Sequence, residues 1–265
     1  MDNMTISPLP QPLVVAYGGG TNSTAMLCGF REIGIKPDLI LFADTGAEQP
    51  HTYKHVEYMK VIVREWFGLE IQIVRHWKRG VFEGREGELQ RLNNLPSLAY
   101  GMKSCSMKYK QEPQHNATRS FMRDVCVDRV TRAIGFDANE SHRVRPSTQP
   151  WADNWFPLVE WGWRRQECLD AICRAGLPRP GKSSCYFCPA MKPSEVLNLK
   201  ENHPDLAEKA LAIERNAQPK HRKPIGLGGE GNFWSNWMAQ DSAQMKLLDL
   251  QPMHTPCHCT DEGEP

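Results

Sequence analysis

The sequence predicts an α/β protein: a parallel sheet with helices on both faces, followed by a helical, cysteine-containing C-terminal part. Short runs that are apolar throughout alternate with stretches of helical periodicity, which is typical of parallel strands buried between two layers of helices. A turn of three glycines joins the first apolar run to the first helix. The expected strands are residues 13–17, 39–43, 71–74 and 130–134, and the expected helices between the first three are 21–30 and 52–67.

Each of these elements has its own local signal. Residues 13–17 are a β-prone apolar run that ends at the glycines, and the periodic stretch after them predicts the first helix. Pro37 and Gly46 bound the second apolar run, and a long periodic segment follows it. Residues 130–134 end at Gly135, which predicts a fourth strand.

The second half of the chain has a different character. We expect an α/β domain over residues 12–162 and a helical C-terminal region over residues 163–265, with helices at 166–175 and 194–216. Residues 78–114 are rich in Gly, Asn, Lys and Arg and weakly periodic, and they are too long for a plain connection. The sequence therefore predicts a functional lid or insertion there.

Composition excludes several classes of protein. The 265 residues are 40% hydrophobic and carry 32 Lys+Arg against 31 Asp+Glu, with a mean hydropathy of -0.54. This is enough apolar material to bury a core, and a charge near zero argues against a protein that coats nucleic acid. No apolar run reaches the ~20 residues of a membrane span, and the first residues lack the pattern of a signal peptide. We expect a cytoplasmic protein with no membrane partner.

The glycine turn is a candidate phosphate site. Gly18, Gly19 and Gly20 let the backbone approach an anion closely, and the N–H groups at the start of the next helix point toward it. Ser23 and Thr24 add hydroxyl donors. The segment matches neither the Walker loop nor the dinucleotide fingerprint, and a glycine turn without a ligand is the alternative.

Polar residues follow two of the expected strands. Asp44 and Thr45 come directly after the second strand, where ligands of parallel sheets bind, so Asp44 is a candidate ligand of Mg²⁺; a turn-capping Asp is the alternative. Glu140, Ser141 and Arg143 follow the fourth strand. Arg143 is the best candidate for a bidentate contact to phosphate or sulfate.

Nine cysteines without an export signal fit poorly with a disulfide framework. Cys185 and Cys188 form a Cys-x-x-Cys turn, which presents two thiolates to zinc or an iron–sulfur cluster, or acts as a thiol redox pair. Cys257 and Cys259 flank His258 near the C-terminus. They are candidates for a mobile thiol, for unreactive tail residues, or for completing a structural zinc site with the first pair.

Residues 18–23 resemble the loop of PP-loop ATP pyrophosphatases, of the adenine nucleotide alpha hydrolase-like superfamily. More closely, the chain resembles the phosphoadenosine phosphosulfate (PAPS) reductase-like branch, including forms common in phages. The resemblance spans about residues 12–200. The motif blocks taken together, in their order along the chain, are more specific than any one block alone. Its further blocks are residues 41–48, 104–110, 135–143 and 156–161, followed by 185–189.

This resemblance implies an enzyme that binds ATP or a sulfonucleotide, either PAPS or adenosine phosphosulfate (APS), with Mg²⁺ on Asp44. It implies a [4Fe-4S] cluster, or zinc, on Cys105, Cys185 and Cys188; the fourth position is then open or filled by Cys257 or Cys259. The nucleotide-binding residues it implies are Tyr17, Gly18, Gly19, Gly20, Asn22, Ser23, Thr24, Thr45, Gly135, Glu140, Ser141 and Arg143.

Three functions follow from the resemblance. The first is sulfur transfer to an adenylylated substrate such as a tRNA or DNA base. The second is reduction of a sulfonucleotide to sulfite, with Cys257 or Cys259 as the nucleophile and thioredoxin as reductant. The third is nucleotide binding without turnover, with a structural zinc. Two departures bear on this choice: Asn22 stands where the family loop has Asp, and Asp137 stands where its block has Arg.

Overall fold

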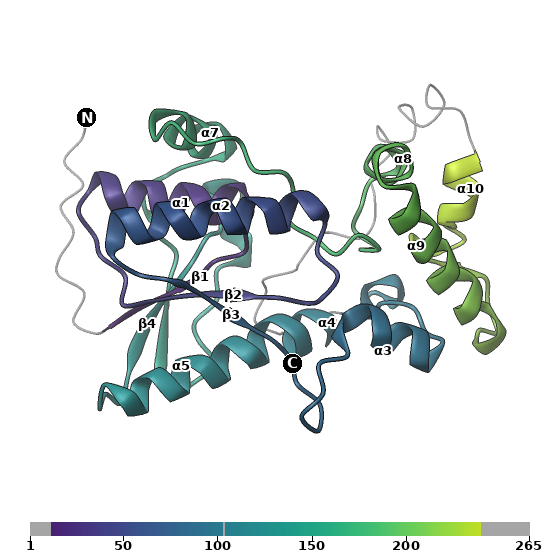
Figure 1. The fold of residues 1–265 in the computed structure, drawn as a ribbon, viewed down its shortest axis with the longest axis horizontal. Helices are drawn as coiled ribbons and strands as arrows, with labels where there is room; N and C mark the ends of the chain where they lie inside the picture. Colours follow the sequence, from purple (N-terminus) through teal and green to yellow (C-terminus); the bar gives the residue numbers. More distant parts are fainter. Residues whose placement is uncertain (1–11, 103, 240–265) are drawn as a thin grey trace.

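The computed structural model describes residues 12–102 and 104–239, and its centre is a parallel sheet of five strands in the order β3-β2-β1-β4-β5 (Figure 1). Helices pack on both faces of the sheet. The predicted α/β fold is confirmed, and the strand order is consistent with the adenine nucleotide alpha hydrolase fold. The strands are β1 (Leu13–Ala16), β2 (Leu39–Ala43), β3 (Ile71–Val74), β4 (Val130–Ile134) and β5 (Ala152–Trp155).

Alternate side chains of the central strand enter two different cores. Leu13 and Val15 of β1 pack into one hydrophobic cluster, and Val14 packs into another on the opposite face. Both faces of the strand are therefore buried, which explains why it is apolar throughout. Parallel pairing places Val15 beside Ile40 of β2 and Ala133 of β4.

The two faces are covered by different helices. The first cluster takes residues from α1 (Thr21–Glu32), α2 (Pro50–Phe67) and α7 (Arg165–Arg174). The second takes residues from α5 (Glu112–Asp124). Since α7 packs on α1, this helix belongs to the core of the sheet although it follows residue 162. The domain boundary at 162 stays a prediction.

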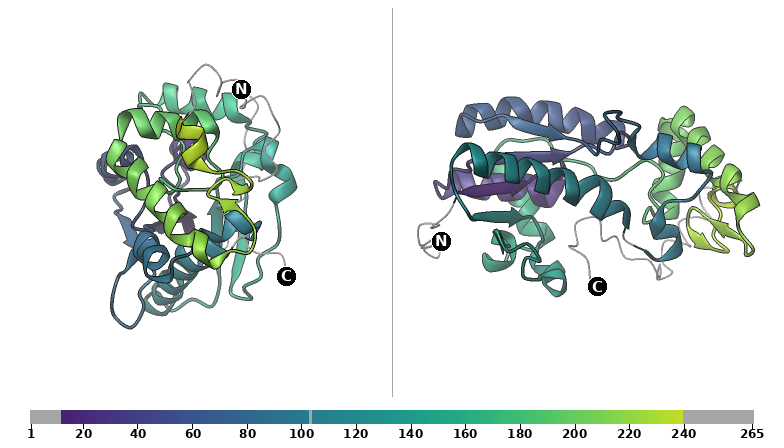
Figure 2. Two further views of the ribbon diagram at one scale, coloured as in Figure 1. Left: turned by 90° about the vertical axis from the view of Figure 1, so that its right-hand side faces the viewer. Right: turned by 90° about the horizontal axis from the view of Figure 1, so that it is seen from below.

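A third core lies at one end of the molecule (Figures 1 and 2). It contains the C-terminal helices together with α3 (Gly84–Leu92) of the predicted insertion. The buried carboxylate of Glu214 accepts hydrogen bonds from the backbone N–H groups of Leu227, Trp234 and Ser235, which joins the parts of this core. Its other elements are α8 (Pro193–Asn202), α9 (Pro204–Ala217), β6 (Ile225–Gly226), β7 (Gly229–Glu230) and α10 (Trp234–Ala239).

The prediction of one helix over residues 194–216 is wrong. The structure has α8 and α9, separated at His203, whose backbone (φ -144, ψ 64) lies outside the helical region. Pro204 is the reason, because proline disfavours the helical conformation of the residue before it and lacks an N–H donor.

Short helices complete the described chain. The predicted insertion holds the turns η1 (Ser97–Tyr100) and α4 (Ser104–Ser106) and the π-helix η2 (Met107–Gln111), which runs into α5. The others are η3 (Ala138–Arg143), α6 (Pro157–Glu160) and η4 (Gln218–Lys220). Within residues 12–102 and 104–239, no helix combines the length and apolarity that a bilayer span requires.

Candidate functional site

A cleft of about 480 Å³ opens at the carboxyl ends of β1, β2 and β4. This is the edge at which parallel α/β sheets bind ligands. The glycine turn and the first turn of α1 form one wall. The predicted site residues that line the cleft are Tyr17, Gly18, Gly20, Asn22, Ser23, Gly135, Glu140 and Arg143.

Two glycines of the turn, Gly19 and Gly20, lie where a side chain would be strained or crowded. Gly19 has a φ of +70°, which favours glycine, and a Cβ on Gly20 would lie 2.9 Å from Oγ of Ser183. A Cβ on Gly135 would lie 3.1 Å from the backbone N of Ser23. Gly20 is also the N-cap of α1 and has no side chain to cap the first-turn N–H groups. The loop is therefore a backbone cradle suited to an anion.

Hydrogen bonds from the start of α1 fix this loop. Thr24 is fully buried, and its Oγ1 lies 3.2 Å from the hydroxyl of Tyr17 and 3.0 Å from Nε2 of His55. Burial lowers the pKa of His55, so the ring is neutral at pH 7. Ser23 donates to the carbonyl of Gly20 at 3.2 Å. Thr24 thus holds the loop in place from behind and does not line the cleft.

The charge of the cleft lining suits a polyanion. Five basic side chains face two carboxylates, those of Glu140 and Glu195. Burial lowers the pKa of Arg132 to about 10, so its guanidinium still carries charge at pH 7. An anion in the cleft would offset the cost of burying that charge. The basic residues are Lys110, Arg132, Arg143, Arg165 and Lys182.

Asn22 belongs to a network at one side of the cleft. Its Nδ2 donates to Oδ2 of Asp137 at 3.1 Å and to Oε2 of Glu140 at 2.9 Å. Glu140 also pairs with Arg143, whose guanidinium stacks on Phe136 at 4.2 Å from the ring centroid. The network holds Arg143 at the cleft. It joins a residue of the glycine turn to residues of the block 135–143, both of which were predicted to belong to the site.

Hydrogen bonds hold the carboxylate of Asp44 at the end of β2, and one of them caps the turn that follows, as in the alternative given above. One carboxylate oxygen accepts from the Tyr53 hydroxyl at 2.7 Å and the Gly46 N–H at 2.8 Å, and the other accepts from Nε of Arg75 at 2.8 Å. Neither Asp44 nor Ser141 is among the described residues that line the cleft. Mg²⁺ binding by Asp44 stays a prediction, and it would require these hydrogen bonds to rearrange.

Three cysteines from two distant segments line a second, smaller cavity of about 50 Å³. They are Cys105 of α4 and the pair Cys185 and Cys188. Oγ1 of Thr45 lies 3.3 Å from Sγ of Cys185, which brings the end of β2 to this cavity. Burial, followed by the charge of Glu48, raises the pKa of Cys185 to about 12, so a metal must displace its proton.

The cysteines of this cavity are thiol donors, the ligand type of both zinc and iron–sulfur clusters. Among residues 12–102 and 104–239, no three His, Cys, Asp or Glu side chains converge as one metal ion requires. Cys257 and Cys259, named above as candidate ligands or nucleophiles, lie outside the described residues.

One lysine and one short segment connect the two cavities. Lys110, in the π-helix η2, lines both the cleft and the cysteine cavity and pairs with the buried Glu48 at 3.3 Å. Lys182 and Ser183 line the cleft, and they lie three and two residues before Cys185. π-Helical turns are frequently found at functional sites.

Sequence reasoning missed several residues of the cleft. The missed ones include Arg132, Arg165, Lys182 and Ser183. Arg132 had a usable signal, because a charged residue in an otherwise apolar buried strand needs a partner. The others had none, since tertiary packing brings residues 165 and 182–183 to the glycine turn.

No family model matches this chain. The chain is 25% identical over 233 residues to the uncharacterized protein MJ0066 of Methanocaldococcus jannaschii. That alignment covers 82% of this chain and 44% of the relative, so the chain spans less than half of the relative's length. A solved structure, the U34-tRNA thiolase NcsA from Methanococcus maripaludis with its [4Fe-4S] cluster, is 16% identical with a TM-score of 0.45. The alignment covers 78% of this chain and 73% of the NcsA chain. The tRNA and the cluster belong to NcsA.

Proposed function

We propose that this chain is a PAPS reductase-like enzyme of the PP-loop type, which binds ATP and transfers sulfur to a substrate activated by adenylylation. The observation that carries the proposal is the joint position of the two cavities. Cys105, Cys185 and Cys188 line one cavity, and Lys110 belongs to its wall and to that of the anion cleft. A phosphate site and a thiol site in contact are what such a reaction needs.

The chemistry follows from these two sites. An oxygen of the acceptor attacks the α-phosphorus of ATP, the bond to the β-phosphate oxygen breaks, and pyrophosphate leaves. Basic side chains such as Arg132, Arg143 and Lys182 stabilise the charge that develops on it. Hydrosulfide, a co-substrate at the sulfide oxidation level, then attacks the activated carbon, the carbon–oxygen bond breaks, and AMP leaves with the former acceptor oxygen. The bound nucleotide brings Mg²⁺, which further neutralises the phosphates.

The three cysteines would hold a [4Fe-4S] cluster, with the fourth position open or taken by Cys257 or Cys259. When bound, such a cluster would supply a place to carry the sulfur that is delivered. The acceptor we propose is a nucleobase of tRNA or DNA. Because the cleft lining is basic, a nucleic acid backbone would also be attracted to its rim.

The second candidate is reduction of PAPS or APS to sulfite, with Cys257 or Cys259 attacking sulfur and thioredoxin regenerating the thiol. The intact glycine turn, which sulfonucleotide reductases have largely lost, favours a triphosphate instead. A nucleotide-binding module with a structural zinc is the third candidate. The replacement of Asp by Asn22 and of Arg by Asp137 is the feature that favours it.

Anaerobic purification followed by iron, sulfide and zinc analysis tests the proposal first. We expect about four irons per chain, loss of iron in Cys105→Ser, and full iron in Cys126→Ser, a control at an exposed cysteine. One zinc and no iron would contradict the proposal. Pyrophosphate release from ATP in the presence of tRNA or DNA supports sulfur transfer, whereas sulfite release from PAPS without ATP identifies a reductase.

A further inference from the structure

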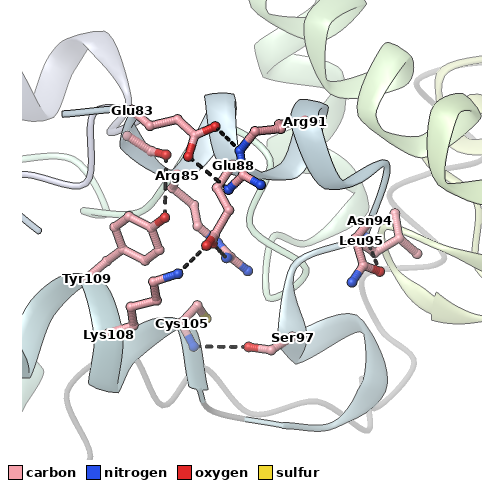
Figure 3. Close-up of polar contacts among 11 residues, drawn as sticks. Glu83, Arg85, Glu88, Arg91, Asn94, Leu95, Ser97, Cys105, Lys108 and Tyr109 are labelled. Atoms are coloured by element: carbon pink, nitrogen blue, oxygen red, sulfur yellow. Dashed lines mark hydrogen bonds and ion pairs between the residues drawn. The ribbon is translucent and has the colours of Figure 1, made fainter. Parts of the chain in front are cut away.

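Arg85 is a buried cation in the wall of the cysteine cavity. It lies in the first turn of α3, its side chain is only 10% exposed, and it lines the cavity together with the three cysteines. Figure 3 shows its guanidinium extending from α3 on the side of Cys105, beside Glu88 and Lys108. None of the blocks of the family resemblance includes this residue.

The contacts of Arg85 leave its charge only partly neutralised. Nη1 donates to Oε2 of Glu88 at 2.8 Å, but the same carboxylate also pairs with Lys108. One carboxylate therefore serves two cations. Nε of Arg85 is buried and has no hydrogen-bond partner in residues 12–102 and 104–239. A buried donor without a partner is costly, which points to an anionic group that completes this site.

The backbone of Arg85 ties it to the cysteine turn. Its N–H donates to the carbonyl of Thr45 at 2.8 Å, and the hydroxyl of Thr45 lies 3.3 Å from Sγ of Cys185. Gly84, with a φ of +69°, brings the start of α3 against Thr45. A Cβ added to Gly84 would lie 3.4 Å from the carbonyl oxygen of Thr45. The position of the guanidinium is thus fixed by the same strand end that holds Cys185.

We infer that Arg85 acts through the three cysteines as a positioning residue. Its positive charge compensates the negative charge of their thiolates and of the iron–sulfur group that the thiolates hold. Loading the cavity places thiolates in its wall, because a metal or cluster binds cysteine in the thiolate form. Arg85 lowers the free energy of that state, and Glu88 limits the effect by sharing its charge between two cations. This inference rests on the proposed function, because it requires a cluster on Cys105, Cys185 and Cys188.

Four variants of the full chain, reconstituted anaerobically, test the role of Arg85. R85Q removes the charge, R85K keeps it, and E88Q removes the carboxylate that offsets it. R91Q is the matched control. Arg91 is on the same helix, but it pairs with Glu83 and is not among the residues that line the cavity. The readouts are the midpoint potential of the cluster, the rate of iron loss to a chelator, and the midpoint of urea unfolding.

We expect R85Q to shift the cluster potential to more negative values, since a nearby cation stabilises the reduced, more negative state. E88Q shifts it in the opposite direction, and R85K and R91Q stay near the wild type. Iron loss becomes about tenfold faster in R85Q, in line with other changes beside a metal site, and R85K restores it.

The outcomes separate the two proposals. If the wild-type chain takes up no cluster, the proposed function fails and the role of Arg85 fails with it. If the wild type takes up a cluster but R85Q and E88Q both lose unfolding stability without opposite shifts in potential, only the role of Arg85 is overturned. A variant R85Q that cannot be loaded still leaves E88Q, for which an unchanged or more negative potential contradicts the inference.

Discussion

Asn22 donates a hydrogen bond to Asp137 at 3.1 Å, across 115 residues of sequence. Both residues are the departures named above from the motifs of the PP-loop family that the chain resembles. Their contact explains the departures together, because an Asp at position 22 would face the carboxylates of Asp137 and Glu140. The amide of Asn22 instead satisfies both. With Asn at position 22, the carboxylates of Asp137 and Glu140 both have a hydrogen-bond donor at this side of the cleft.

The first prediction concerns this pair. We expect N22D to lower the free energy of unfolding by about 1–2 kcal/mol, because it replaces two hydrogen bonds with like-charge repulsion in a partly buried site. D137R in the same chain should recover most of the loss by supplying the cation of the family motif. Urea unfolding of the two single variants and the double variant measures the coupling energy. Additive effects would contradict a direct interaction.

The second prediction concerns Gly135, which packs against the phosphate loop. A Cβ here would lie 3.1 Å from both N and Cα of Ser23, so G135A must displace loop backbone rather than a mobile side chain. We expect ATP to bind about tenfold more weakly, measured by calorimetry, because the loop N–H groups lose alignment. G34A is the control: Gly34 has a φ of +74° and open space around it. It should lower stability by about 1 kcal/mol through backbone strain and leave ATP affinity unchanged.

Sequence reasoning recovered those elements whose signal is local. The strands at 39–43, 71–74 and 130–134 have the bounds that their apolar runs predict. β5 was missed because it is a polar edge strand in which only Ala152 is buried. The split between α8 and α9 was missed although Pro204 marks it, because the apolar periodicity continues across the break.

The site was predictable to a different extent. The glycine turn and Arg143 carry recognisable motifs, and both line the cleft. Cys105 meets Cys185 and Cys188 only in the folded chain. No local motif links them, and the sequence pairs them only through the family resemblance, in which a cysteine site precedes a Cys-x-x-Cys turn at a similar separation. Lys182 and Arg85 carry no local signal, since their roles depend on which buried surfaces the fold places beside them.

The third prediction separates the contribution of Lys110 to folding stability from its contribution to ATP binding. Its ammonium group pairs with the carboxylate of Glu48, whose side chain is 1% exposed, at 3.3 Å. K110Q should lower the free energy of unfolding by about 3 kcal/mol, because it leaves a buried carboxylate without its cation. The double variant E48Q/K110Q should regain stability and still bind ATP more weakly than wild type. The exposed K209Q on α9 is the control for loss of a lysine. If E48Q/K110Q binds ATP as wild type does, Lys110 has only a structural role.

The last prediction is a pH dependence of stability that arises at His115, beside the cleft. Burial, followed by the charge of Arg132, lowers the pKa of His115 to about 4, against an ordinary value of 6.5. Between these two values the unfolded chain binds the proton more strongly than the folded chain. The stability from this residue is therefore complete above pH 6.5 and is lost as the pH falls toward 4, by at most about 3 kcal/mol. Urea unfolding of H115Q should show a flatter profile over this window, whereas H142Q, at an exposed histidine, should keep the wild-type slope. Equal slopes in wild type and H115Q would show that His115 does not carry the effect.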